Sequence, residues 1–349
     1  MKASGVSTVA LSQSLRLSLV RAQAELVKAQ KEAQTGRAAD TGLALGTGTA
    51  QSVSFARDLE RISGIIDSNS LVSARLKATQ DALAQISAAA QSFLSTLMTS
   101  SSGDAIGNVT RDSARTTLEA LTDILNTSFN GENIFAGINT DVKPLNDYTA
   151  PGSTAKASFD AAFLAHFGFT QDDPAAASIS VTDMNAFMDM QVEPLFMGAG
   201  WATDWSNASD QRIVSRITLT ETTQTSVSAN QDGFRKLAMA ATVIMDLFDS
   251  NVGPGARAAL VERAVSLVGD AIGGLGDLQA TTGIIQQRVA NATERLEVQS
   301  DLFERRIGNL LDIDPYEAAT RVSTLLTQIE TSYALTARLQ QLSITRFIS

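Results

Sequence analysis

The chain has 349 residues, of which 44% are hydrophobic and only 5% aromatic, and its formal net charge is −10. It contains no cysteine and one histidine, His166, which excludes disulfides, thiol nucleophiles, cysteine-ligated zinc and multi-histidine metal sites. The acidic balance argues against nucleic acid as a partner. Because the apolar content lies mainly in Ala, Leu, Val and Ile, we expect long helices that pack along apolar seams.

The amino-terminal stretch from Val6 to Val20 is interrupted by Ser, Thr, Gln and Arg16, unlike the apolar region of a secretory signal. No stretch approaches the roughly 18 to 20 consecutive apolar residues of a membrane span. We therefore expect no membrane insertion, and export, if it occurs, without a cleaved signal peptide.

Residues 1–128 contain no proline, and their apolar residues recur at steps of three and four, which predicts two long amphipathic helices. The first has the seam Leu15, Leu19, Ala22, Leu26, Ala29 and Ala33. The second runs from Ala56 to Ser100 with the seam Ile62, Ile65, Asn69, Val72, Leu76, Thr79, Leu83, Ile86, Ala90, Phe93 and Leu97. Four glycines between residues 35 and 52 predict a break between these helices, and a shorter helix follows from about Thr110 to Phe129.

The middle of the chain differs in composition. Residues 141–210 hold ten acidic residues against Lys143 and Lys156, and four of the six prolines lie in the same part of the chain. We expect a compact acidic insert of small mixed α/β structure at residues 146–208. The β-branched stretch at residues 212–230 predicts a β-hairpin that returns the chain to the helical part.

The carboxy-terminal part again shows helical spacing. Pro254 suits the start of a helix, although several glycines between Gly269 and Gly283 predict interruptions in it. In "DIDPYEAA", Asp314 is placed to cap a new helix, Pro315 to occupy its first position, and Glu317 to complete a capping box. The seam of this last helix is Val322, Leu325, Ile329, Ser332, Thr336 and Leu339.

The sequence contains few candidate residues for catalysis, metal binding or ligand binding. His166 among phenylalanines is better explained as a half-buried core residue than as an acid-base group. Asp172 and Asp173 before Pro174 are better explained as a solvated turn than as a cation site, and Trp201 and Trp205 as core rather than as a ligand platform. We predict no catalytic residue, no metal site and no cofactor.

Four segments together resemble the bacterial flagellin family, most closely its hook-filament junction branch. They are "AQKEAQTGRAAD", "FNGENIFAGINTDVKPL", "SVSANQDGFRKL" and the terminal "LLDIDPYEAATRVSTLLTQIETSYALTARLQQLSITRFIS". The second is the most specific, because the branch carries a motif matched here by Asn130, Gly131, Ile134, Phe135, Ala136, Gly137, Thr140 and Asp141. The longer amino-terminal signature of filament flagellins is represented only by "AQTGRAAD", which favours the junction branch.

The resemblance implies a mainly α fold, with a long antiparallel helical bundle or coiled coil built from the paired amino- and carboxy-terminal regions. It divides the chain into terminal assembly helices (residues 1–45 and 312–349), a helical rod with the hairpin (46–145 and 209–311) and a surface insert (146–208). The motif turn would pass the chain from the rod to the insert. The assembly seam would comprise Leu15, Leu19, Leu26, Leu325, Ile329 and Leu339, ordering as subunits assemble.

The implied function is a structural adaptor at the hook-filament junction of the extracellular flagellum. Its implied partners are copies of itself, the first hook-associated protein, flagellin, an export chaperone and the type III export apparatus. Three alternatives stay open: a filament flagellin, a cytoplasmic coiled-coil signalling protein, and an enzyme carried by the insert.

Overall fold

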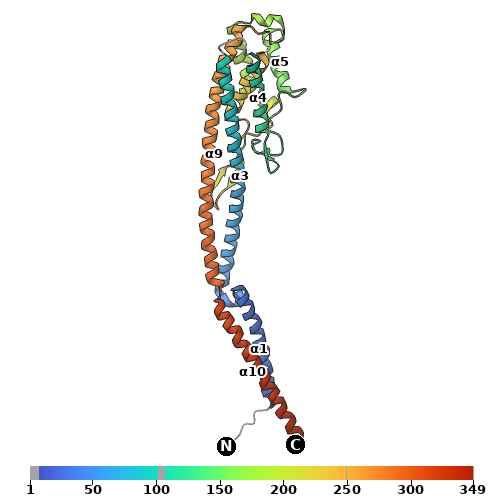
Figure 1. Ribbon diagram of the computed structural model, residues 1–349, viewed down its shortest axis with the longest axis vertical. Coiled ribbons are helices and arrows are strands. Elements are labelled where there is room, and N and C mark those ends of the chain that lie inside the picture. The colour runs from blue at the N-terminus through green and yellow to red at the C-terminus, as the bar shows by residue number, and fades with distance from the viewer. Residues whose placement is uncertain (1–7, 101–106, 249, 349) are drawn as a thin grey trace. The chain divides into compact units, whose positions relative to one another are not determined.

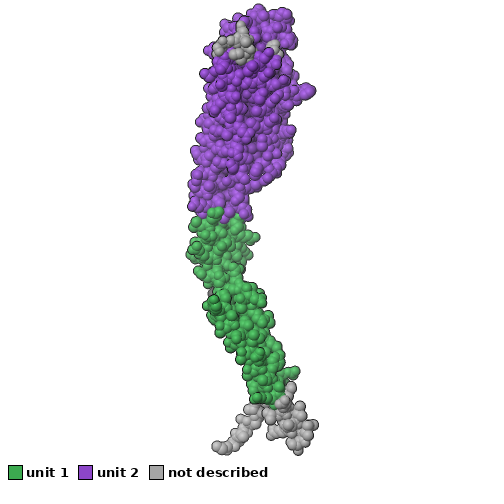
Figure 2. Space-filling model, in the orientation of Figure 1, with its two compact units in different colours: residues 1–63, 297–349 green, residues 64–296 purple. Residues whose placement is uncertain are grey.

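The computed structural model describes residues 8–100, 107–248 and 250–348, and the chain forms two compact units (Figures 1 and 2). Unit 1 comprises residues 1–63 and 297–349, and unit 2 comprises residues 64–296. Most of the described chain is helical, so the predicted mainly α fold is confirmed.

Unit 1 is built around two terminal helices, α1 (Thr8–Thr35) and α10 (Pro315–Ile348), which run side by side in Figure 1. A short helix α2 (Thr41–Leu45) and a 3-10 turn η1 (Gly46–Gly48) fill the break predicted from the glycines. The start of α3 (Thr49–Ser100) and the end of α9 (Pro254–Leu311) complete the unit, where Phe55 stacks on Phe303 with ring centroids 5.6 Å apart.

In unit 2, α3 and α9 run antiparallel. Gln80 donates to the Gln279 carbonyl at 2.7 Å, and farther along Asn69 donates to Thr293 at 3.1 Å. The expected interruptions of α9 do not occur, and the helix runs unbroken from Pro254 to Leu311. A Cβ on Gly274 would lie in ordinary contact with the Cα of Gly233, at 3.4 Å, whereas nothing lies within 4 Å of the Cβ positions of Gly269, Gly273 and Gly276.

The centre of unit 2 is α8 (Asp232–Leu247), which packs against α4 (Gly107–Leu125). All but a few side chains of α8 are buried, including Phe234, Leu237 and Ile244. The sequence from Phe234 to Leu247 is apolar around most of the helix, which is the pattern of a helix enclosed on all sides. The α4 helix ends at Leu125, four residues before the predicted end, because the chain enters a β-turn there.

Two small antiparallel hairpins connect these helices. Strands β1 (Ser128–Phe129) and β2 (Glu132–Asn133) form the first, and β3 (Val214–Arg216) and β4 (Thr222–Gln224) form the second, with Ser215 opposite Thr223. The second hairpin is the one predicted within residues 212–230. Its buried Ile217 packs with Leu76 and Val289, and Asn69 donates to the Ile217 carbonyl at 2.9 Å, so the hairpin binds both long helices.

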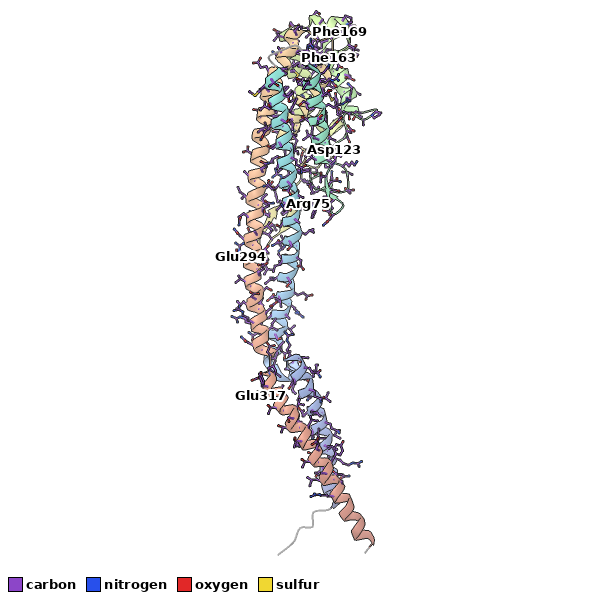
Figure 3. The ribbon with its side chains drawn as sticks, viewed as in Figure 1. Arg75, Asp123, Phe163, Phe169, Glu294 and Glu317 are labelled. Carbon is purple, nitrogen blue, oxygen red and sulfur yellow. The ribbon has the colours of Figure 1, made fainter. Side chains whose placement is uncertain are left out.

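The regular elements of the insert are all helical, whereas a mixed α/β insert was expected. Its elements are α5 (Thr154–Phe167), η3 (Pro174–Ser178), α6 (Val181–Phe187), η4 (Met188–Val192), α7 (Glu193–Met197) and η5 (Trp201–Trp205). Both η4 and η5 are π-helical turns. Aromatic side chains, among them Phe163 and Phe169 (Figure 3), form a core that is continuous with that of α4, α8 and α9. The insert therefore lacks a core of its own.

Candidate assembly interface

The terminal helices pair in antiparallel fashion through contacts at successive levels. Gln23 donates to the hydroxyl of Tyr333 at 3.0 Å, and Arg321 donates to Glu32 at 3.2 Å. Along this helix pair the deeply buried apolar side chains are mostly small. Among the described residues of α1 and α10 they are Ala22, Ala29, Ala318 and Ile329. Small side chains let the two helices approach closely but bury little apolar area.

The predicted seam residues whose side chains the structure describes lie on the faces where the two helices meet. Leu15, Leu19, Leu26 and Leu325 are half-buried, and Ile329 is buried. The side chain of Leu339 lies outside the described residues. Pairing within one chain therefore brings the predicted seam together, and a role of these residues in assembly stays a prediction.

A second set of apolar side chains on the same helices faces outward. Leu17, Val20 and Val27 on α1 are between 61% and 66% exposed. Leu326 and Tyr333 on α10 are 42% and 53% exposed. We call these five residues the outer stripe. The sequence reasoning missed them, although Val20, Val27 and Leu326, Tyr333 each recur at a spacing of seven, the same helical signal as the seam.

A joint connects the terminal helices to the rest of unit 1. Gly36 follows α1 with φ +67°, and its carbonyl accepts from Ile313 at 2.8 Å, while Ala38 donates to the Leu311 carbonyl at 3.0 Å. The carboxylate of Glu32 accepts from the backbone N–H of Ala39 at 3.2 Å as well as from Arg321. These hydrogen bonds join the segment that follows α1 to the segment between α9 and α10.

At that second break Asp314 caps α10 as predicted, accepting from the Tyr316 N–H at 2.8 Å. Glu317 does not complete the capping box. Its carboxylate pairs instead with Arg321 one turn later, at 3.0 Å. An (i, i+4) cation was within reach and offers a charged partner in place of a backbone N–H.

The motif at residues 130–137 is a tight turn followed by a buried anchor. Asn130 and Gly131 connect β1 to β2, and both have positive φ, +52° and +85°, as a two-residue type I′ hairpin turn requires. Asn is one of the few residues other than Gly that adopts this conformation at small cost. The side chains of Ile134, Phe135 and Ala136 are fully buried directly after the hairpin.

The anchor is tied to the segment that enters α8. Ala229 donates to the Phe135 carbonyl at 2.7 Å, and the Phe135 ring meets Phe234 edge-on, with centroids 5.8 Å apart. Ser209 donates to the Ala136 carbonyl at 3.0 Å. Two of the segments quoted for the resemblance, which are far apart in the sequence, are therefore in contact.

The hairpin is also fixed to α3 by Arg75, which is labelled in Figure 3. The Arg75 guanidinium donates to Glu132 at 2.9 Å and to the Asn133 carbonyl at 3.4 Å. Only 13% of the Arg75 side chain is exposed, so this is a partly shielded ion pair. No sequence signal distinguished Arg75 from other polar residues of the long helix, because its partner lies 57 positions away.

The weak chemical candidates have structural roles. His166 is half-buried and meets Phe167 edge-on at 4.7 Å. The Asp173 side chain accepts from the Ala175 N–H at 2.8 Å and so caps η3. Trp201 and Trp205 are buried and stack on each other with centroids 5.5 Å apart. Within the described ranges, His, Asp and Glu side chains form no group that could hold a metal ion.

A partly buried polar network joins the insert to α8. Tyr148 donates to Asp246 at 2.5 Å, and Lys156 donates to Asp246 at 3.2 Å and to Asp160 at 3.0 Å. Burial and the neighbouring Asp246 charge raise the pKa of Tyr148 well above its usual value. Burial also raises the pKa of Asp246, and the contacts from Tyr148 and Lys156 only partly oppose this. Burial lowers the pKa of Lys156, but the two carboxylates outweigh it and the net shift is upward.

None of the helices in the part of the chain that the structure describes combines the length and apolar character needed to cross a membrane.

Comparisons with known proteins match both ends of the chain. Residues 6–140 match the family model of the bacterial flagellin N-terminal helical region, and residues 265–348 match that of the bacterial flagellin C-terminal helical region. Among solved structures, a putative flagellar hook-associated protein from Vibrio parahaemolyticus is similar, with a TM-score of 0.52 and 9% identity. The alignment covers 75% of this chain and 97% of that chain, and at this identity it concerns the fold alone. No curated protein matches the chain in sequence.

Proposed function

The chain belongs to the bacterial flagellin family of flagellar structural proteins, and we propose that it is the adaptor that joins the hook to the filament. As a member of this family it is a structural component of the extracellular flagellum and not an enzyme. In the proposed role, copies of the chain form a ring or a short helical lattice. The first hook-associated protein lies on one side of it and flagellin on the other.

The observation that best supports a role in assembly is the outer stripe on the terminal helices. An isolated helix pair can bury one face of each helix, but α1 keeps Leu17, Val20 and Val27 in solvent on a further face, and α10 keeps Leu326 and Tyr333 exposed. Apolar side chains at helical spacing gain free energy when another helix covers them. A shallow groove lies beside this stripe, lined by Leu17, Arg21 and Leu325 among others.

In the proposed mechanism, the seam closes α1 against α10 within each subunit, and the outer stripe packs against the same helices of neighbouring subunits. The deeply buried side chains between α1 and α10 are mostly alanine, so in this mechanism contacts between subunits supply much of the apolar burial. Ordering of the terminal helices and joining of subunits would then be thermodynamically coupled. Repetition of one contact around a symmetric lattice produces the ring.

The junction role, as opposed to the filament role, is supported by the sequence. The motif at residues 130–137 and the short "AQTGRAAD" segment are closer to the junction branch than to filament flagellins. We further propose export as an unfolded chain through the flagellar type III apparatus, with the help of an export chaperone. The domain division into terminal assembly helices, rod and insert, with boundaries near residues 45, 145, 209 and 312, belongs to the same proposal.

Immunogold electron microscopy of intact cells tests the function. Antibody raised against residues 146–208 is applied to wild-type cells and to cells that lack the gene, which serve as the control for specificity. We expect one cluster of label per flagellum at the boundary of hook and filament. Label along the whole filament would instead identify a filament flagellin. Label confined to the cytoplasm would contradict a role in the assembled flagellum.

A further inference from the structure

The turn between β1 and β2 contains the one asparagine of the sequence that a glycine follows, Asn130. Such a pair is chemically labile in water, because the main-chain nitrogen of the second residue can attack the side-chain amide carbon of the first. A side chain on the second residue hinders that attack, and Gly131 has none. The turn therefore has the residues for deamidation, a modification that needs no enzyme.

The reaction balances with water as the only co-reactant. The Gly131 nitrogen loses its proton and bonds to Cγ of Asn130, while the Cγ–Nδ2 bond breaks and the amide leaves with that proton as ammonia. Water then opens the five-membered succinimide ring at one of its two carbonyl carbons. The product is aspartate or isoaspartate, and in isoaspartate the main chain passes through the former side chain and is one atom longer. A longer main chain does not fit the two-residue turn that pairs Phe129 with Glu132.

Solvent reaches this turn in the folded protein. Asn130 and Gly131 are both exposed, and apart from the chain neighbours of Gly131 no atom lies within 4 Å of the position that a Cβ on it would take. Burial therefore does not protect Asn130, and protection has to come from conformation.

The conformation of the turn opposes ring closure. The φ values, +52° at Asn130 and +85° at Gly131, are those of a type I′ turn, whose first central residue has a ψ of about +30°. At this ψ the Gly131 nitrogen and the Asn130 Cβ lie on nearly opposite sides of the Cα–C bond. The succinimide ring requires them on the same side, so Asn130 can cyclise only after the hairpin has opened.

Interactions of β2 and the residues after it keep the hairpin closed. Arg75 donates to the Glu132 carboxylate at 2.9 Å, and the side chains of Ile134 and Phe135 are fully buried directly after the hairpin. When a reaction requires opening, its rate in the folded protein is the rate in the unfolded chain multiplied by the small open fraction. We propose that Asn130 is a deamidation site that the folded hairpin protects, so that chains deamidate there chiefly while they are unfolded.

Mass spectrometry of the full chain after incubation at mildly alkaline pH tests the proposal. The chain is incubated folded in buffer and unfolded in guanidinium chloride, and samples taken over time are digested at mildly acidic pH to prevent further reaction. Fragmentation of the peptides gives the deamidated fraction at each asparagine. Asn139 is the internal reference, because it is also exposed but is followed by Thr140.

Two variants test whether the hairpin provides the protection. Arg75→Ala removes the ion pair that fixes β2 to α3, and Glu132→Gln removes the same pair from its exposed side, so that one variant remains if the other does not fold. Lys77→Ala is the matched control, because Lys77 also lies on α3 but pairs with Asp81, at 3.5 Å, and not with the hairpin. Tryptophan fluorescence checks that each variant is folded. The rate of each variant in guanidinium chloride is its own reference, which removes any effect of the substitution on intrinsic reactivity.

In the wild type we expect Asn130 to deamidate about tenfold or more faster in guanidinium chloride than in buffer. In guanidinium chloride it should also react faster than Asn139. Arg75→Ala and Glu132→Gln should each lower the ratio of the unfolded to the folded rate about threefold or more, whereas Lys77→Ala should keep the wild-type ratio.

Three results overturn the proposal. They are equal rates at Asn130 in the folded and the unfolded chain, a rate in the unfolded chain no higher than that of Asn139, and a wild-type ratio in the folded variants that lack the ion pair. None of these results depends on the position of the protein in the flagellum.

Discussion

Gly137 occupies a place where the backbone leaves no room for a side chain. Its φ is +64°, and a Cβ atom would lie 2.3 Å from the carbonyl oxygen of Ser209 and 2.6 Å from that of Gln211. Gly131, in the same motif, also has a positive φ, but nothing lies within 4 Å of its Cβ position. The two glycines are therefore required for different reasons, Gly131 by conformation alone and Gly137 also by close approach of another segment.

We predict that Gly137→Ala lowers the free energy of unfolding of unit 2 by at least about 2 kcal/mol, because backbone strain adds to a clash with backbone atoms that cannot turn aside. Gly131→Ala, with strain alone, should cost about 1 kcal/mol. Urea unfolding monitored by the fluorescence of Trp201 and Trp205, both buried in unit 2, measures both effects. Equal losses in the two variants would show that the close approach at Gly137 has no energetic consequence.

The Tyr148–Asp246 hydrogen bond predicts a pH dependence of stability. Because burial and Asp246 raise the pKa of folded Tyr148 above its usual value of 10.0, this residue stabilises the fold fully below pH 10.0 and progressively less above it. As the pH rises above 10.0, the unfolded chain releases the Tyr148 proton whereas the folded chain keeps it. The difference in unfolding free energy between wild type and Tyr148→Phe should therefore shrink as the pH rises beyond 10.0. A difference that is the same at neutral and alkaline pH would contradict this.

At the scale of elements, the terminal helices present two apolar faces with different predicted roles. Ile329 is 8% exposed and belongs to the seam within one chain, whereas Val27 is 66% exposed and belongs to the outer stripe.

The insert shows a different local effect: Pro194 lies in the first turn of α7, directly after the π-helical turn η4. Proline cannot donate to the preceding turn, and a widened turn accommodates it.

We predict that Ile329→Asp and Val27→Asp both abolish filament attachment, for different reasons. A buried charge at Ile329, like one at half-buried Leu26, should separate α1 from α10 and speed amide hydrogen exchange in both helices of the monomer. A charge at Val27 should leave that exchange unchanged and block only the contact between subunits. Val27→Ile, which keeps the apolar surface, is the control and should assemble normally.

Electron microscopy and motility in cells lacking the native gene measure assembly, and Trp fluorescence checks that unit 2 stays folded. Normal assembly of Ile329→Asp would contradict the seam, and normal assembly of Val27→Asp would contradict the outer stripe.

At the scale of the whole molecule, each unit holds together by a different balance of forces. Unit 2 has a large continuous core of aromatic and aliphatic side chains drawn from the insert, α4, α8 and α9. The paired helices of unit 1 bury mainly alanine and keep aliphatic residues in solvent. A chain that assembles into a lattice needs this contrast, because surfaces reserved for neighbouring subunits cannot also close a core within the subunit.

The sequence by itself determined the helices, their seams, the break between residues 35 and 52, the cap at Asp314 and the second hairpin, because these depend on neighbours within a few positions. It also contained the segments that resemble the flagellin family, and it predicted structural roles for His166, Asp173 and the two tryptophans. Only the tertiary structure decided that the insert shares the core of unit 2, that α9 runs unbroken past its glycines, and that Arg75 holds Glu132 and Tyr148 holds Asp246. These features join residues tens of positions apart or depend on which face of a helix a neighbour covers, and local periodicity contains neither kind of information.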